Sequence, residues 1–126
     1  MSMRSPLGQV RGHGAAKAGV RSWWLLRLTA ISLVPLTLWF VYSVVSLGGA
    51  DYAAVIAWVR APGTALLLAL LLFAMFTHLT LGVTEVIEDY VHNESLKVAS
   101  LIVLKLAAFF LAASGIFAVL KIAYGG

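Results

Sequence analysis

His78 is the residue of this sequence whose chemistry stands out, because it lies inside a long apolar run. A helix that crosses a membrane avoids groups that need water or a metal, so an imidazole there requires a partner. A neutral imidazole can bind a metal through one ring nitrogen while the other nitrogen makes a hydrogen bond. In a membrane helix bundle without cysteine, the usual metal is haem iron, which takes axial histidines from facing helices.

The residues one turn on either side of His78 are small. Ala74 and Gly82 stand four residues before and after it, which places them on the same face of a helix. Small residues leave room beside the imidazole for a flat macrocycle. They also let two helices approach closely, in which case His78 is an interior histidine that hydrogen-bonds a neighbouring helix. Spacing alone leaves both interpretations open.

A second group of reactive residues, Glu88-Asp89-Tyr90-Val91, follows where this apolar run ends. Helix geometry places Asp89 about 16 Å along the axis from His78, at the membrane surface if His78 is at mid-membrane. Tyr90 could donate a hydrogen bond to a quinone carbonyl while Asp89 helps protons arrive from water. The alternatives are an interfacial aromatic anchor for Tyr90 and a solvated helix end for the acids.

Arg21 and Arg27 stand near the start of the first apolar run. Either could pair with a haem propionate, because the guanidinium fork matches a carboxylate. Both also act as topology determinants, since positive residues stay on the cytoplasmic side of a membrane.

The composition identifies lipid as the natural solvent of this chain. Of its 126 residues, 62% are hydrophobic and 11% are charged. A soluble domain of this size could not hide so much apolar surface. The net charge of +4 is concentrated around the first apolar run, which argues against a nucleic-acid partner. The lack of cysteine excludes iron–sulfur ligation and thiolate catalysis within this chain.

Three apolar stretches predict an all-α membrane protein with three transmembrane helices. The stretches cover about residues 25–47, 64–87 and 98–123, and each is close to the ~20 residues that a helix needs to cross the hydrocarbon core. Residues 51–59 predict a short interfacial helix. Pro35 predicts a bend, without a break, in the first span.

The distribution of positive residues predicts the orientation of the chain. Residues 1–24 form an N-terminal arm, and residues 25–126 form the transmembrane anchor. Three spans place the arm and the loop that contains Lys97 on one side, which holds most of the positive residues. This side is therefore the cytoplasm or the mitochondrial matrix. The first apolar stretch exceeds the ~7–15 residues of a secretory signal, which argues against cleavage, although small residues follow it. The acid-free start of the arm has some transit-peptide character.

The sequence resembles the hydrophobic membrane anchor subunit of succinate dehydrogenase across all three spans. The resemblance depends on Arg27-Leu28-Thr29-Ala30-Ile31, on His78-x-x-x-Gly82 and on Ile87-Glu88-Asp89-Tyr90-Val91-His92. The most specific part is the histidine followed at a fixed distance by Asp-Tyr. The third span matches only in being apolar.

The resemblance implies that the chain packs with a second three-helix anchor subunit around one haem b. His78 would be an axial ligand of the haem iron, Arg27 would approach a propionate, Tyr90 would contact the quinone and Asp89 would border its site. Family members often carry a histidine shortly before the first span, where this chain has Arg21. Arg21 could replace that histidine as a propionate partner, or the contact is missing, because His13 is too far upstream.

The resemblance also implies the function. The chain would anchor a succinate:quinone oxidoreductase, with flavoprotein and iron–sulfur subunits docked on the cytoplasmic face and no dicarboxylate chemistry of its own. The expected location is the bacterial inner membrane, with the mitochondrial inner membrane as the alternative. Two competing functions remain. One is the anchor of another b-type quinone-linked complex, such as a fumarate reductase, and the other is a haem-free, three-span accessory protein.

Overall fold

The computed structural model describes residues 6–125, with side chains described from residue 19 onward. All regular secondary structure in this part of the chain is helical. The elements are α1 (Pro6–Ser46), α2 (Tyr52–Arg60), α3 (Pro62–Tyr90) and α4 (Glu94–Tyr124).

Three segments of the described chain are long and apolar enough to cross a membrane, namely Gly19–Ser46, Pro62–Tyr90 and Glu94–Tyr124. The prediction of an all-α protein with three spans is confirmed. Each helix is longer than its apolar stretch, because a helix ends where its caps are and not where its hydropathy falls. At the start of α4, for example, the Asn93 side chain accepts a hydrogen bond of 3.1 Å from the Leu96 N–H.

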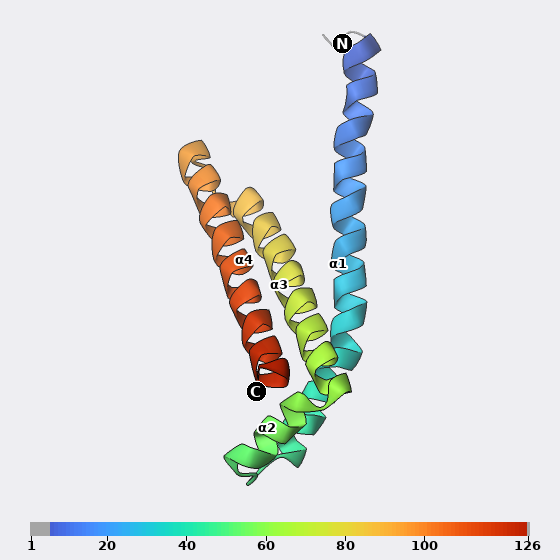
Figure 1. Cartoon of the computed structure of the whole chain (residues 1–126). Helices are drawn as coiled ribbons and strands as arrows, with labels where there is room; N and C mark the ends of the chain where they lie inside the picture. Colours follow the sequence, from blue (N-terminus) through green and yellow to red (C-terminus); the bar gives the residue numbers. More distant parts are fainter. Residues whose placement is uncertain (1–5, 126) are drawn as a thin grey trace.

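The largest difference from the predicted bounds is at the start of α1. The first span was predicted from about residue 25, whereas α1 begins at Pro6 and includes most of the predicted arm. A proline in the first turn is compatible with a helix, and no other proline occurs before Pro35. The helix continues through Pro35, and in Figure 1 the ribbon changes direction in the part of α1 that follows.

The short helix predicted over residues 51–59 is present as α2, and its position at the membrane interface stays a prediction. Gly49, with a φ of 80°, turns the chain after α1. The Asp51 side chain then caps α2 by accepting a hydrogen bond of 2.9 Å from the Ala54 N–H. Trp58 of α2 stacks on Trp39 of α1, with ring centroids 5.9 Å apart. This short helix connects the ends of α1 and α3, and its backbone packs on α4 and α3.

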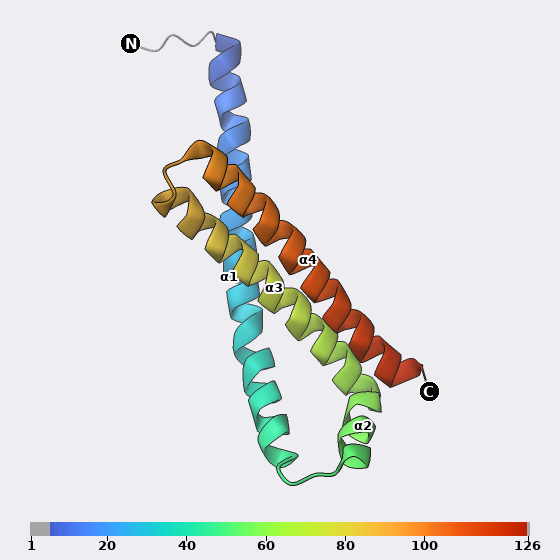
Figure 2. The same ribbon diagram turned by 90° about the vertical axis from the view of Figure 1, so that its left-hand side faces the viewer.

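Helix α3 is the central element of the fold. Among the described residues, α1 and α4 each pack on α3 and make no close backbone contact with each other. Figure 1 shows α3 between its two neighbours, with the start of α1 and the α3–α4 connection at one end of the molecule. The C-terminus and the α1–α2 connection lie at the other end. Figure 2 shows α1 crossing behind α3, and in Figure 1 the two helices diverge toward the end of α3 that connects to α4.

The chain has almost no hydrophobic core of its own. The buried apolar residues are few and mostly small, and no large side chain among the described residues is fully buried. They are Val59, Ala65, Leu68, Ala74 and Ala108. Many large apolar side chains on all three spans point outward instead. Such a surface is stable against lipid or against other membrane subunits, and not in water.

The contact between α3 and α4 depends on a small residue. A Cβ atom added at Gly115 would lie 3.1 Å from Leu72 Cδ1. Glycine at this position therefore lets the two helices approach closely, as small residues do in membrane bundles generally.

Candidate functional site: a histidine–threonine pair between two spans

His78 lies on the face of α3 that meets α1. Its side chain is half-buried, and its Nδ1 atom lies 3.0 Å from Oγ1 of Thr29. The two residues are 49 positions apart in the sequence. Their contact fixes which face of the first span meets the histidine.

Thr29 is one of the few buried polar residues in the described part of the chain, with 8% of its surface exposed. Its hydroxyl oxygen also lies 2.7 Å from the carbonyl oxygen of Leu25 and 3.1 Å from that of Leu26. Threonine side chains commonly donate to a carbonyl one turn back in the same helix. The hydroxyl therefore joins the backbone of α1 to the imidazole of α3.

The two small neighbours of His78 differ in their surroundings. Ala74 is buried within this chain. A Cβ atom added at Gly82, in contrast, would meet no heavy atom within 4 Å. The open space beside His78 thus lies one turn further along α3, toward Asp89 and Tyr90.

Arg21 and Arg27 of α1 lie toward the same end of the molecule as the open space at Gly82. Arg27 is exposed, and its guanidinium carbon lies 5.1 Å from the centroid of the Trp23 ring, a cation–π contact. It stands half a turn from Thr29 and therefore near the level of His78. Arg21 is also exposed and lies about 12 Å along the axis from Thr29, closer to the membrane surface.

Asp89 and Tyr90 are the last residues of α3, and the structure does not bring them to His78. Tyr90 lies about 18 Å from His78 along the helix axis. Both side chains are exposed, with 76% of Tyr90 accessible. At this end α1 has diverged from α3 (Figure 1), and the described part of the chain leaves the phenol and the carboxylate exposed.

The described residues contain no group of three or more histidine, cysteine, aspartate or glutamate side chains placed to hold a metal ion. The described residues therefore do not form a complete metal site by themselves. Within the described spans, His78 offers a single imidazole.

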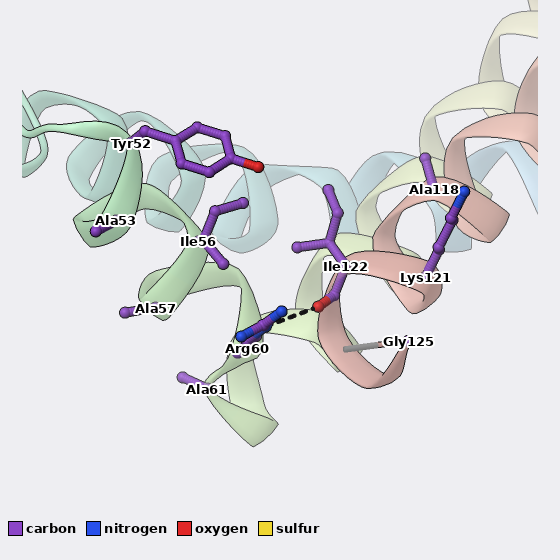
Figure 3. Close-up of a pocket in the computed structure, with 10 residues that line it drawn as sticks. All are labelled: Tyr52, Ala53, Ile56, Ala57, Arg60, Ala61, Ala118, Lys121, Ile122 and Gly125. Atoms are coloured by element: carbon purple, nitrogen blue, oxygen red, sulfur yellow. Dashed lines mark hydrogen bonds between the residues drawn. The ribbon is translucent and has the colours of Figure 1, made fainter.

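A hollow that contains none of these residues lies at the opposite end of the molecule. It has a volume of about 1000 Å³ and lies between α2 and the end of α4 (Figure 3). Arg60 crosses it, and its Nε–H donates a hydrogen bond of 3.0 Å to the carbonyl oxygen of Ile122. None of the predicted site residues lines this hollow. A narrower groove of about 440 Å³ runs between α3 and α4 and includes Lys105.

Comparison with known proteins decides the family. Residues 1–113 match the family model described as succinate dehydrogenase/fumarate reductase transmembrane subunit. The chain belongs to this family. It is 31% identical over 103 residues to the succinate dehydrogenase hydrophobic membrane anchor subunit of Rickettsia bellii, which covers 82% of each chain. It is 26% identical over 104 residues to the protein of the same name from Rickettsia conorii, again over 82% of each.

Membership of the succinate dehydrogenase/fumarate reductase family confirms the predicted function at the level of the enzyme complex. The chain is a transmembrane anchor subunit, and its relatives are parts of an enzyme complex in bacteria. Of the alternative of a haem-free, three-span structural or accessory protein, the part that places the chain outside this enzyme family is wrong, and the presence of haem stays a prediction. The roles predicted for individual residues are not tested by these relatives and remain predictions.

Thr29 is the site residue to which sequence reasoning assigned no role. It stands within the Arg27–Ile31 stretch, which supported the resemblance, but nothing there indicated a contact with His78. The sequence contains only a weak indication that Thr29 belongs to the site. Thr29 is a hydroxyl residue within a membrane span, and several other hydroxyl residues occur in the same spans.

Proposed function

We propose that this chain is the haem- and quinone-binding anchor of a succinate dehydrogenase complex in the bacterial inner membrane. The single observation that carries the proposal is His78, an imidazole within a membrane span that is held by a buried hydroxyl from the facing helix. Intramembrane ionisable residues of this kind are expensive to bury and usually functional.

The surroundings of His78 fit a haem b that is shared with a second anchor subunit. One imidazole is supplied here, and the open space at Gly82 is on the correct face for a flat group next to it. The haem would supply a one-electron redox centre within the bilayer. Arg27 and Arg21 would pair with its propionates from the cytoplasmic side, since guanidinium groups bind carboxylates with two parallel hydrogen bonds.

Quinone would bind at the Asp89–Tyr90 end of α3. The Tyr90 phenol would donate a hydrogen bond to a quinone carbonyl and so favour negative charge on that oxygen as electrons arrive. Asp89, at the same water-accessible helix end, would pass protons from solvent toward the quinone. Since both side chains are exposed in this chain, other subunits would complete the walls of the site.

The remaining chemistry of the complex would be carried out by partner subunits. A flavoprotein subunit would oxidise succinate. Because this chain contains no cysteine for an iron–sulfur cluster, a separate iron–sulfur subunit would deliver the electrons to the quinone. These subunits would dock at the Tyr90 end. The excess of positive residues near the start of α1 supports a cytoplasmic position for that end.

The test is a reduced-minus-oxidised absorbance spectrum of the complex, purified in mild detergent through a tag on this chain. We expect sharp b-type haem bands together with flavoprotein and iron–sulfur subunits. Dehydrogenase subunits without a haem signal would keep the anchor role and overturn the role of His78. A complex without dehydrogenase subunits would overturn the proposed function as a whole.

A second candidate is an anchor for fumarate reduction, because the matching family includes both enzymes. The names of the two relatives favour succinate oxidation. The ratio of succinate:quinone to quinol:fumarate activity in the purified complex separates the two directions.

A further inference from the structure

The contacts of the Thr29 hydroxyl determine where its proton lies. Three acceptor-capable atoms surround Oγ1: the Leu25 carbonyl oxygen at 2.7 Å, the Leu26 carbonyl oxygen at 3.1 Å and His78 Nδ1 at 3.0 Å. A hydroxyl has one proton, and a carbonyl oxygen has none to donate. A contact of 2.7 Å between two oxygens is a hydrogen bond only if the Thr29 proton points at Leu25.

The proton on the third contact must therefore come from His78. Once the Thr29 O–H donates to the backbone, its lone pairs can only accept, so Nδ1 of His78 carries the hydrogen and donates it to Oγ1. In a neutral imidazole the other nitrogen, Nε2, is then unprotonated. Its lone pair is the one that a metal would use.

We propose that Thr29 is the positioning residue that holds His78 as its Nδ1–H tautomer, with Nε2 presented for haem iron. This inference rests on the proposed function. The relay of hydrogen bonds, from His78 N–H to the Thr29 hydroxyl and from there to the Leu25 carbonyl, keeps the ring at a fixed angle to α1. It also leaves more electron density on the imidazole, because each bond in such a chain polarises the next.

Two measurable consequences follow for the haem. A more electron-rich axial ligand stabilises the ferric state, so the intact relay lowers the midpoint potential of the haem. A fixed ring orientation slows haem loss. Partners of this kind typically contribute 10- to 100-fold to metal affinity.

The experiment compares variants of Thr29 in the full complex, with spectroelectrochemical titration of the haem and the rate of haem transfer to excess apomyoglobin. Thr29→Val keeps the shape of the side chain and removes the hydroxyl. We expect a higher midpoint potential and haem loss about tenfold faster or more. Thr29→Ser keeps the hydroxyl and should remain close to wild type in both readouts.

Thr80→Val is the matched control. The Thr80 hydroxyl also donates to a carbonyl one turn back, that of Phe76 at 2.7 Å, whereas the hydroxyl that contacts His78 belongs to Thr29. The same substitution there should leave the potential and the haem loss rate unchanged. Equal shifts in both valine variants would mean that the effect comes from loosening of the bundle, and would overturn the positioning role.

A graded variant keeps the inference testable if Thr29→Val does not assemble. Thr29→Cys retains a small side chain that can donate weakly to Leu25 but is a poor acceptor. We expect a midpoint potential above that of Thr29→Ser. Equal potentials for the serine and cysteine variants would overturn the inference.

The failure of this inference can be distinguished from that of the proposed function. Haem that is lost in His78→Ala but unaffected in Thr29→Val would leave His78 as the ligand and remove Thr29. A wild-type complex without haem would remove both.

Discussion

Two hydrogen bonds that join different helices of this chain differ in almost every respect except length. One connects Thr29 of α1 with His78 of α3 over 3.0 Å, between a buried and a half-buried side chain inside the spans. The other connects Arg60 of α2 with the Ile122 carbonyl oxygen near the end of α4, also over 3.0 Å, and its side chain is exposed (Figure 3). Their positions relative to water explain the difference in what they do.

Water is available to Arg60 and not to His78. If the contact of Arg60 with Ile122 is broken, solvent at the helix end can replace either partner. If the contact of His78 with Thr29 is broken, an imidazole N–H remains within the spans without a partner, and buried polar groups in that state are expensive. A polar pair is retained in such a place when it has a task, whereas a surface pair needs no such explanation.

The largest effect that we expect concerns the first of these regions. His78→Ala should abolish or nearly abolish the b-type haem signal of the purified complex and lower its thermal stability, because an axial ligand and the partner of Thr29 are lost together. The control is His92→Ala, which removes an exposed histidine from the α3–α4 connection. Full haem content with unaltered ligation in His78→Ala would contradict the assignment.

The next largest effect concerns two exposed tyrosines at opposite ends of the molecule, Tyr90 and Tyr124. Tyr90→Phe should lower quinone reductase activity about 100-fold, in the range for a lost proton-handling group, while haem content and assembly stay unchanged. Tyr124→Phe is the matched control, since Tyr124 at the end of α4 is exposed to nearly the same extent, 73% against 76% for Tyr90. Unchanged quinone turnover in Tyr90→Phe would remove this residue from the mechanism.

An apolar contact between helices gives an intermediate effect. Gly115→Leu should destabilise the complex by about 1–3 kcal/mol, because the new side chain overlaps Leu72 and pushes α3 and α4 apart. Gly63→Leu places the same side chain in open space near the start of α3 and should change stability far less. The measurement is the thermal midpoint of the complex in one detergent, and equal shifts for the two variants would contradict the close packing at Gly115.

The smallest effect is expected at the exposed hydrogen bond. Arg60→Gln should lower stability by about 1 kcal/mol or less, since a water-accessible bond contributes little net free energy, and the haem spectrum should not change. Lys121→Gln, which removes an exposed cation that lines the same hollow, serves as the control. A fall in the thermal midpoint of the complex in Arg60→Gln as large as in His78→Ala would contradict the ranking of the two regions by their access to water.

Much of the fold follows from the sequence. Apolar stretches of the length of a bilayer require helices, since every backbone polar group must be paired within the lipid. The three spans and the short helix α2 were therefore predictable. The ends of the helices were less predictable, because hydropathy indicates where lipid begins and not where helical hydrogen bonding begins. The start of α1 at Pro6, well before the first apolar stretch, is the clearest example.

The candidate site divides in a similar way. His78 could be singled out from sequence because an ionisable side chain is rare inside a membrane span. Asp89 and Tyr90 could be placed at a helix end, and their roles remain predictions. The difference between buried Ala74 and open Gly82 could not be foreseen, because both are small and share a face with His78.

The sequence by itself determined the solvent of this protein, its three spans and the one imidazole within them, because hydropathy and residue type act locally. Only the tertiary structure decided that the imidazole meets Thr29. The helices are apolar on all sides, so no amphipathic pattern indicates which face of one meets which face of another. Two residues 49 positions apart therefore become partners only once α1 and α3 have packed.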